Sequence, residues 1–251
     1  MGRFFVTPED IDREAGLIRL TDPEDLRHLV KVLRAREGER VTVSDGISSE
    51  YAAHIAAIDR QEVILEIESE GGFTTELPYP VDLYQGMPKH GKMDLIVQKT
   101  VETGVRSVIP VFMERSIPGE NKNEEKRTQR LRKIALGAAK QSGRGLLPTV
   151  ETPVQFEQAL AELSGYDLVL FLYEDEEGLT IRDALEQVSP DLPEDACAAL
   201  VVGPEGGFSA AEAEALQELP NCRCVTLGPR ILRTETAAIA ALAQLSYCWE
   251  L

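Results

Sequence analysis

Residues 198–216 read AALVVGPEGGFSAAEAEAL, and residues 224–242 read CVTLGPRILRTETAAIAAL. Each stretch runs from a short apolar segment, through a loop that contains glycine, into the start of a helix. The apolar runs at 198–202 and 225–227 predict strands buried on both faces, as in a parallel sheet. Two strands that end in such loops predict a crevice of the kind in which α/β proteins bind ligands.

The residues of the two loops suit a binding site as well as a turn. Glycine allows positive φ and a close approach of the backbone to a ligand, and the first loop has Gly203, Gly206 and Gly207. Ser209 and Glu212 predict a capping box at the next helix, and Thr234 is the expected N-cap of the last one. Two ordinary tight turns are the alternative for the first loop alone. No G-x-G-x-x-G follows a strand, which argues against a dinucleotide site.

The composition is that of an acidic globular protein. The chain has 251 residues, 43% of them hydrophobic and 27% charged, which fits one large domain or two smaller ones. The formal net charge of −17 argues against nonspecific nucleic-acid binding, so any contact with RNA requires local basic patches. No run approaches about twenty apolar residues, and the N-terminus lacks the apolar core of a signal peptide. We therefore expect a cytoplasmic protein.

The cysteines and histidines predict neither a metal site nor a Ser-His-Asp triad. No Cys-x-x-Cys pair occurs, and the histidines are scattered without metal-ligand spacing. We expect reduced, mostly buried thiols. The residues concerned are Cys197, Cys222, Cys224, Cys248, His28, His54 and His90.

The chain divides by pattern into two parts. Residues 1–72 predict a small β-rich domain with one helix, and residues 71–80, GGFTTELPYP, are the candidate linker. In the helix LRHLVKVLR, one stripe is expected to hold Leu26, Leu29, Val30 and Leu33. Residues 73–251 alternate strands and helices, which predicts a parallel sheet covered on both faces.

Several motifs resemble those of the SPOUT methyltransferases, the knotted S-adenosylmethionine enzymes. LGPRILRTETA resembles their cofactor loop, and GPEGGF upstream is similar to the family of ribosomal RNA small subunit methyltransferase E. HLVKVLR between an opening strand and RVTVSDG resembles the PUA-like N-terminal domain of that family, which is taken to hold RNA. The resemblance covers essentially the whole chain. It implies a PUA-like β-barrel domain at 1–72 and a SPOUT α/β domain with a C-terminal trefoil knot at 73–251.

The resemblance also implies an activity. The family uses S-adenosylmethionine to methylate N3 of a specific uridine in 16S ribosomal RNA of the small subunit, as a homodimer. Uridine N3 is a poor nucleophile while protonated, so a base must remove its proton or donors must stabilise charge on the flanking carbonyl oxygens. Two alternatives remain: a knotted RNA methyltransferase acting on the ribose 2′-oxygen, and a catalytically silent RNA-binding assembly factor.

By resemblance, the cofactor pocket joins the end of the strand DLVLFLYE to both glycine loops and the last helix. The implied cofactor-binding residues are Leu172, Tyr173, Glu174, Gly203, Pro204, Glu205, Gly206, Gly207, Leu227, Gly228, Ile231, Leu232, Thr236 and Ala237. Glu174 or Glu205 could lie near the cationic sulfonium. The alternative for residues 174–177 is a solvated acidic loop.

The motif AAKQSGR, residues 138–144, resembles A-x-x-Q-S-x-R of the family, with Lys140 where many relatives are acidic. The candidate catalytic residues are Arg144, Arg233 and Glu205, and Glu235 is a second candidate base. The candidate RNA-binding residues are Arg3, Arg34, Lys89, Gln141, Ser142, Arg144 and Arg230. The arginines could grip phosphate or polarise the uracil O4, or they could hold structural carboxylates instead. A glutamate at a helix N-terminus can also act as a dipole partner.

Overall fold

The structure, a computed structural model of the chain, describes residues 3–89, 91–116, 124–174, 178–188 and 192–250. It contains two compact units. The first comprises Met1–Glu76 and Ala139–Leu147, and the second comprises Leu77–Ala138 and Pro148–Leu251. A segment from the middle of the chain thus completes the first unit, which the sequence pattern did not indicate. The boundary between folding domains after residue 72 stays a prediction.

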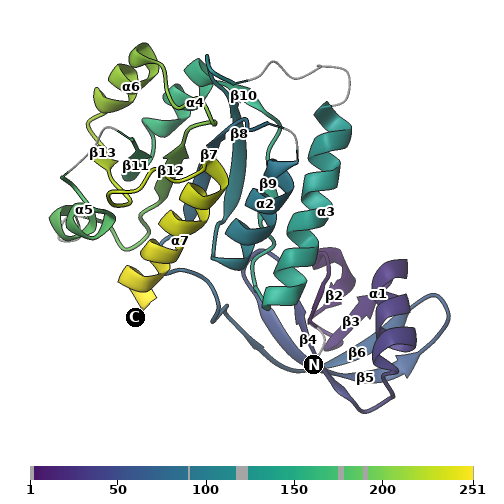
Figure 1. The fold of residues 1–251 in the computed structure, drawn as a ribbon. Helices are drawn as coiled ribbons and strands as arrows, with labels where there is room; N and C mark the ends of the chain where they lie inside the picture. Colours follow the sequence, from purple (N-terminus) through teal and green to yellow (C-terminus); the bar gives the residue numbers. More distant parts are fainter. Residues whose placement is uncertain (1–2, 90, 117–123, 175–177, 189–191, 251) are drawn as a thin grey trace. The chain divides into compact units, whose positions relative to one another are not determined.

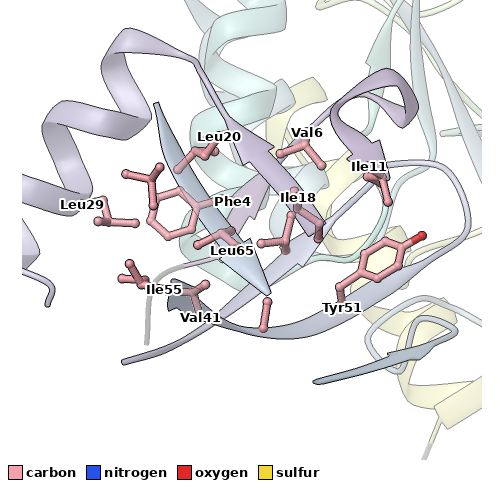
Figure 2. Close-up of a cluster of buried hydrophobic side chains, with 13 residues drawn as sticks. Phe4, Val6, Ile11, Ile18, Leu20, Leu29, Val41, Tyr51, Ile55 and Leu65 are labelled. Carbon is pink, nitrogen blue, oxygen red and sulfur yellow. The ribbon is translucent and has the colours of Figure 1, made fainter. Parts of the chain in front are cut away.

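The first unit is built on one six-stranded sheet. Its strands are β1 (Arg3–Phe5), β2 (Ile11–Asp12), β3 (Leu17–Leu20), β4 (Arg40–Ser44), β5 (Glu50–Ile58) and β6 (Val63–Gly71), in the order β1-β4-β5-β6-β3-β2. β1 pairs with β4 in parallel, and the other pairs are antiparallel. Figure 2 shows the apolar core, in which Phe4, Ile18 and Leu65 are almost completely buried.

The predicted helix of the first unit consists of two short pieces. Helix α1 (Pro23–Arg27) starts at Asp22, whose carboxylate accepts two backbone N–H groups, and a π-helix (His28–Leu33) follows. The expectation that Val30 and Leu33 lie on the buried stripe is wrong, since they are 40% and 44% exposed. A π-helix bonds residue i to i+5, so side chains at α-helical spacing do not stay on one face.

Residues 139–147 are joined to the rest of the first unit by several contacts. Gly46 and Leu146 form a parallel bridge, and the Ser44 hydroxyl donates to the carbonyl of Gly145 at 2.6 Å. Lys140 forms an ion pair with the buried carboxylate of Asp25. The segment is therefore bound to this unit, with Arg144 and Gly145 buried and Gln141, Ser142 and Leu147 exposed.

The second unit is built on a parallel sheet of seven strands, as predicted. The strands are β7 (Val81–Gly86), β8 (Ser107–Phe112), β9 (Thr149–Val150), β10 (Val154–Gln155), β11 (Leu168–Leu172), β12 (Ala198–Val202) and β13 (Cys222–Val225). Their order is β10-β8-β7-β12-β11-β13, and β9 pairs with β8. Every residue of β12 is buried, as its apolar run predicted, and every residue of β11 is buried too. The prediction of a strand at 225–227 buried on both faces is wrong. β13 ends at Val225, which alone of its residues is buried, because this strand lies at the edge of the sheet. Strand order does not describe threading, so the trefoil knot stays a prediction.

Helices cover both faces of this sheet. They are α2 (Lys92–Glu102), α3 (Glu124–Ser142), α4 (Phe156–Leu163), α5 (Ile181–Val188), α6 (Ala210–Gln217) and α7 (Thr234–Glu250). Successive residues of β7 show the two faces, because strand side chains alternate. Tyr84 packs in the core beneath α4 and α6, whereas Gln85 bonds to the start of α7. Figure 1 shows α7 beside α2, with which it packs.

Two helix starts test the local signals. The capping box of Ser209 and Glu212 at α6 is confirmed. The sequence Thr152-Pro153-Val154-Gln155 predicts a second capping box that opens a helix, but this prediction is wrong. Val154 and Gln155 pair with β8, and α4 begins only at Phe156. Within the described ranges, no helix is long and apolar enough to cross a membrane.

Candidate functional site

A cavity of about 950 Å³ opens in the second unit at the carboxyl ends of β11, β12 and β13. Ligands of open α/β sheets bind at such strand ends, and ligand pockets commonly measure about 300–1,000 Å³. The segments after all three strands contribute to the lining, together with the first residues of α2 and α7. The structure thus brings both glycine loops to one cavity.

The first loop follows β12 and contains glycines where a side chain would not fit. A Cβ atom at Gly203 would lie 2.8 Å from the ring of Phe208. Gly207 has φ +67°, and a Cβ there would lie 2.8 Å from Oε1 of Glu174. The loop therefore packs closely against its own Phe208 and against the strand end that carries Glu174.

The second loop follows β13 and is held by a neighbouring segment. The backbone N–H of Thr226 donates to the carbonyl of Leu179 at 2.8 Å, and the hydroxyl of Thr226 accepts from the N–H of Gly228 at 3.2 Å. Gly228 has φ +104°, and a Cβ there would meet open space. Ile231 lines the cavity although its side chain is 86% exposed. The loop is thus anchored at its start and open to solvent at its tip.

Lys92, the first residue of α2, joins two carboxylates beside the cavity. Its Nζ lies 3.1 Å from Oε1 of Glu205 and 3.0 Å from Oε2 of Glu235. The hydrogen bond to Glu235 raises the pKa of Lys92. Burial acts to raise the pKa of Glu205, but backbone N–H donors, including that of Lys89, and the Lys92 ammonium outweigh it and lower this pKa. The three side chains are therefore ionised at neutral pH and carry one net negative charge.

The three arginines proposed for the active site have different surroundings. Arg230 and Arg233 line the cavity, are exposed, and form no ion pair with a carboxylate among the described residues. Arg144 belongs to the first unit and is only 3% exposed. Its Nε donates to Oε2 of Glu76 at 2.9 Å, and its Nη2 forms an ion pair with the same carboxylate. Arg144 is thus engaged with a carboxylate, as the structural alternative for these arginines expects, and its part in catalysis stays a prediction.

The candidate RNA-binding residues are spread over both units. In the first unit, Arg3 pairs with Glu50 at 2.5 Å and its side chain is 15% exposed. Arg34 is exposed and ends the π-helix with φ 54°. Gln141 and Ser142 are exposed at the end of α3. The second unit supplies exposed Lys89 and Arg230. Within this set, the side chains of Arg3 and Arg144 form ion pairs with carboxylates.

The predicted cofactor-binding residues line the cavity except for Gly206 and Thr236. Gly206 packs against Arg115, whose guanidinium donates to its carbonyl at 2.9 Å, and Thr236 is exposed on α7. Of the acidic run at 174–177, only Glu174 lies within the described residues, and it is exposed. The lining residues that the motifs did not predict are Lys92, Gly178, Thr180, Val202, Phe208, Val225, Thr226, Pro229 and Thr234.

The unpredicted lining residues fall into two groups. Those such as Phe208 and Thr234 lie inside the quoted stretches, so a broader reading of the loops would have included them. Lys92, Gly178 and Thr180 come from other segments. The turn between Lys89 and Lys92 predicts a place for phosphate but not a part in this cavity, and Gly178 and Thr180 carry no motif of their own. Only the fold brings them to the cavity.

The described residues also bear on metals and thiols. No group of three or more His, Cys, Asp or Glu side chains among them is placed to hold a metal ion. The four cysteines are half-buried and free of disulfides. His90 lies outside the described residues.

Comparisons with known proteins define the class. Residues 75–246 match the family profile "RNA methyltransferase domain", and residues 20–68 match "RNA methyltransferase PUA domain". The fold and the cavity are therefore those of an RNA methyltransferase with a PUA domain. The chain is 34% identical over 254 residues to ribosomal RNA small subunit methyltransferase E of Bacillus subtilis, covering 100% of this chain and 98% of that protein. The chain belongs to the ribosomal RNA small subunit methyltransferase E family.

Other relatives and solved structures agree. The protein of the same name from Synechocystis is 32% identical over 97% of this chain and 77% of its own length. The crystal structure of that methyltransferase from Neisseria gonorrhoeae, bound to S-adenosyl methionine, superposes with a TM-score of 0.81 at 32% identity, covering 99% and 98% of the two chains. A hypothetical protein of known structure gives 0.85 at 33% identity, with coverage of 99% and 98%. The predicted family and the pairing of a PUA-like domain with a methyltransferase domain are thus confirmed.

Proposed function

We propose that the protein transfers a methyl group from S-adenosylmethionine to N3 of a specific uridine in 16S ribosomal RNA of the small subunit. The observation that carries this proposal is the convergence of both glycine loops on one cavity at the ends of three parallel strands. Membership of a family whose Neisseria member binds S-adenosyl methionine supports it.

The cavity residues fit this cofactor. Backbone groups and apolar side chains such as Leu172, Leu227 and Leu232 suit an adenine and a ribose. Gly228 leaves open space where any side chain would project. The carboxylates of Glu174 and Glu205 supply negative charge for a cation. When bound, the cofactor supplies an activated methyl group on its sulfonium, and no metal ion is needed to activate it.

The cavity also contains groups suited to the uracil. Because its pKa is lowered, Glu205 is a weak base at neutral pH and is better suited to electrostatic stabilisation than to proton removal. Arg233 forms no ion pair within 4.0 Å among the described residues, although its charge helps to lower the pKa of Glu235. We assign it to a uracil carbonyl oxygen, where negative charge develops as N3 loses its proton. Arg230, beside it, is assigned to the RNA backbone. Arg144 is assigned a structural role, as the ion-pair partner of Glu76.

RNA binding is proposed to involve the domain at 1–72 as well as the methyltransferase domain at 73–251. Exposed Arg34 is the most available cation of the proposed set in the first unit, because Arg3 is partly engaged by Glu50. Lys89, Gln141 and Ser142 add exposed polar groups. Local cations are required because the net charge of −17 repels phosphate. A ribosomal substrate supports the proposal of a cytoplasmic protein.

A homodimer is proposed from the surface of α7. One side of this helix is buried within the chain, but Thr236, Ala243 and Tyr247 on another side are exposed, Tyr247 by 55%. Ala243 follows Thr236 by seven positions and Tyr247 follows Ala243 by four, and such spacings place the three residues on one helix face. A second copy of the chain would bury this stripe of small and aromatic side chains.

The decisive test is product analysis. Small ribosomal subunits from a strain that lacks the gene are incubated with the protein and S-adenosylmethionine, and their nucleosides are identified by mass spectrometry. We expect 3-methyluridine. A ribose 2′-O-methyl product would contradict the base specificity, and cofactor binding without any methyl transfer would indicate a silent assembly factor.

A further inference from the structure

Gln85 lies next to the last residue of β7, and its side chain is completely buried. It is not among the residues that line the cavity. Its Nε2 donates to the hydroxyl of Thr234 at 2.8 Å and to the carbonyl of Gly86 at 3.0 Å, and it lies 3.5 Å from the carbonyl of Gly203. A buried amide is unfavourable unless it is hydrogen-bonded, so these bonds explain how glutamine is accommodated in an otherwise apolar strand end.

The donor and acceptor of each hydrogen bond around Thr234 can be assigned. The hydroxyl of Thr234 carries a single hydrogen, which it donates to the carbonyl of Gly203 at 2.6 Å. It must therefore accept from Gln85, which fixes the amide with its nitrogen toward Thr234. The amide oxygen, Oε1, is left buried without a partner among the described residues. Reversing the amide would set this oxygen against two acceptors, so the relay runs from Gln85 through Thr234 to Gly203.

The relay joins three segments where they are packed tightly. A Cβ atom at Gly86 would lie 2.5 Å from Cδ of Pro204, and one at Gly203 would lie 2.8 Å from the ring of Phe208. Gly203 and Thr234 both line the cavity, the first after β12 and the second at the start of α7. A shift of either segment would thus change the cavity wall and break the relay.

We propose that Gln85 is a positioning residue of the cavity, which fixes the Gly203 carbonyl and the first residue of α7 through the Thr234 hydroxyl. The inference deepens the proposed function and rests on it for the identity of the ligand. Gln85 itself touches no ligand. Its own contact with the Gly203 carbonyl, at 3.5 Å, is at the outer limit of a hydrogen bond. Its influence on affinity therefore passes chiefly through Thr234, and removing either member of the pair has nearly the same consequence.

The test is a double-mutant cycle on the affinity for S-adenosylmethionine, measured by calorimetry. Gln85→Met keeps the volume and removes the amide, and Thr234→Val keeps the shape and removes the hydroxyl. Each is expected to weaken binding by about tenfold, the effect of losing roughly one buried hydrogen bond. The double variant is expected to bind about as well as either single one, because the relay is already broken. Thr234→Ser, which keeps the hydroxyl, should retain most of the affinity that Thr234→Val loses.

Thr100→Val is the matched control. Thr100 is also a fully buried threonine of a helix, and its hydroxyl donates to the carbonyl of Ile96 at 2.7 Å, outside the cavity lining. Its loss should leave affinity unchanged. Melting without ligand shows whether each variant folds. If Gln85→Met does not fold, the difference between Thr234→Val and Thr234→Ser carries the test.

Additive losses in the cycle, or unchanged affinity in a folded Gln85→Met protein, would overturn the inference. An unchanged protein that binds no S-adenosylmethionine would contradict the proposed function instead. In that case the relay is tested on the free energy of unfolding, where the losses from Gln85→Met and Thr234→Val should not add. Additive losses would overturn the relay as well.

Discussion

Gly228 holds a backbone conformation that side chains disfavour, with φ +104° and open space beside it. In Gly228→Val, a β-branched residue would be strained at this angle and would project into that space. We expect calorimetry to show a loss of S-adenosylmethionine affinity of at least about tenfold. Gly137→Val is the control, since Gly137 also faces open space but lies within α3 without a positive φ. Equal affinities in the two variants would contradict the role of Gly228.

Lys92 contributes to the cavity through its ion pairs with Glu205 and Glu235. In Lys92→Met, Glu205 and Glu235 lose their shared ammonium and repel each other, which should move both segments of the cavity wall. We expect S-adenosylmethionine affinity to fall by about tenfold. Lys99→Met, on the same helix, removes an ion pair with Glu102 in which the lysine side chain is 40% exposed. Its affinity should not change, because exposed pairs contribute little.

The pair of Glu76 and Arg144 predicts a pH dependence of stability. Burial acts to raise the pKa of Glu76, but Arg144 and the N–H groups of Gly145 and Leu146 outweigh it and lower this pKa. A glutamate whose folded-state pKa is below its unfolded value of about 4.3 stabilises the fold when the pH is above that unfolded value. The contribution is lost as the pH falls through the folded-state pKa.

The prediction is tested by denaturant unfolding at pH 7 and pH 3. Glu76→Gln should lower the free energy of unfolding by about 3 kcal/mol at pH 7, because it leaves the buried Arg144 without a counter-charge, and by less at pH 3. Glu68→Gln removes the exposed partner of Arg40 and should cost less than about 1 kcal/mol. Equal effects of the two substitutions at pH 7 would contradict a structural role for Arg144.

Single residues differ in how far their roles follow from the sequence. Glycine and capping residues act on the backbone beside them, so the loop at Gly203 and the cap at Ser209 were predictable. Lys92 and Gln85 act through partners more than one hundred positions away, and no local pattern indicates such partners. The type of Arg144 shows that it will pair with an anion, but the fold decides that the anion is Glu76.

At the scale of elements, long apolar runs were predictable and short or irregular pieces were not. β11 and β12 were predictable because each consists of five consecutive apolar residues, and all of these residues are buried. β2, β9 and β10 have two residues each and exist only through their pairing with longer strands. The π-helix departs from the 3.6-residue period on which the prediction of its buried stripe was based.

Helix α7 carries the prediction on assembly. Ala238, Leu242 and Leu245 are buried in the chain, whereas Ala243 lies on the exposed stripe with Tyr247. Ala243→Arg places a charge in the proposed interface and should convert the dimer to a monomer, as measured by light scattering at micromolar concentration. Ala211→Arg, at an exposed position of α6, should remain dimeric. A monomeric unchanged protein would contradict the proposed assembly.

For the whole molecule, the composition of the first unit gives a prediction about fragments. This unit includes Ala139–Leu147, which pairs with Asp25, Ser44, Gly46 and Glu76. A fragment of residues 1–76 should therefore unfold at a lower urea concentration than the same fragment mixed with a peptide of residues 139–147. Circular dichroism measures both transitions. A scrambled peptide is the control, and identical midpoints for all three samples would show that the segment adds no stability.

The split composition of the first unit also bears on its synthesis, since translation delivers the chain from its N-terminus. At about 5–20 residues per second, the ribosome needs roughly 4–14 s to proceed from Glu76 to Leu147. During that interval Asp25 has no ion pair with Lys140, and Glu76 has none with Arg144. In the folded protein, both carboxylates are partly or fully buried. The nascent N-terminal unit cannot reach its full native stability until translation has passed the middle of the chain.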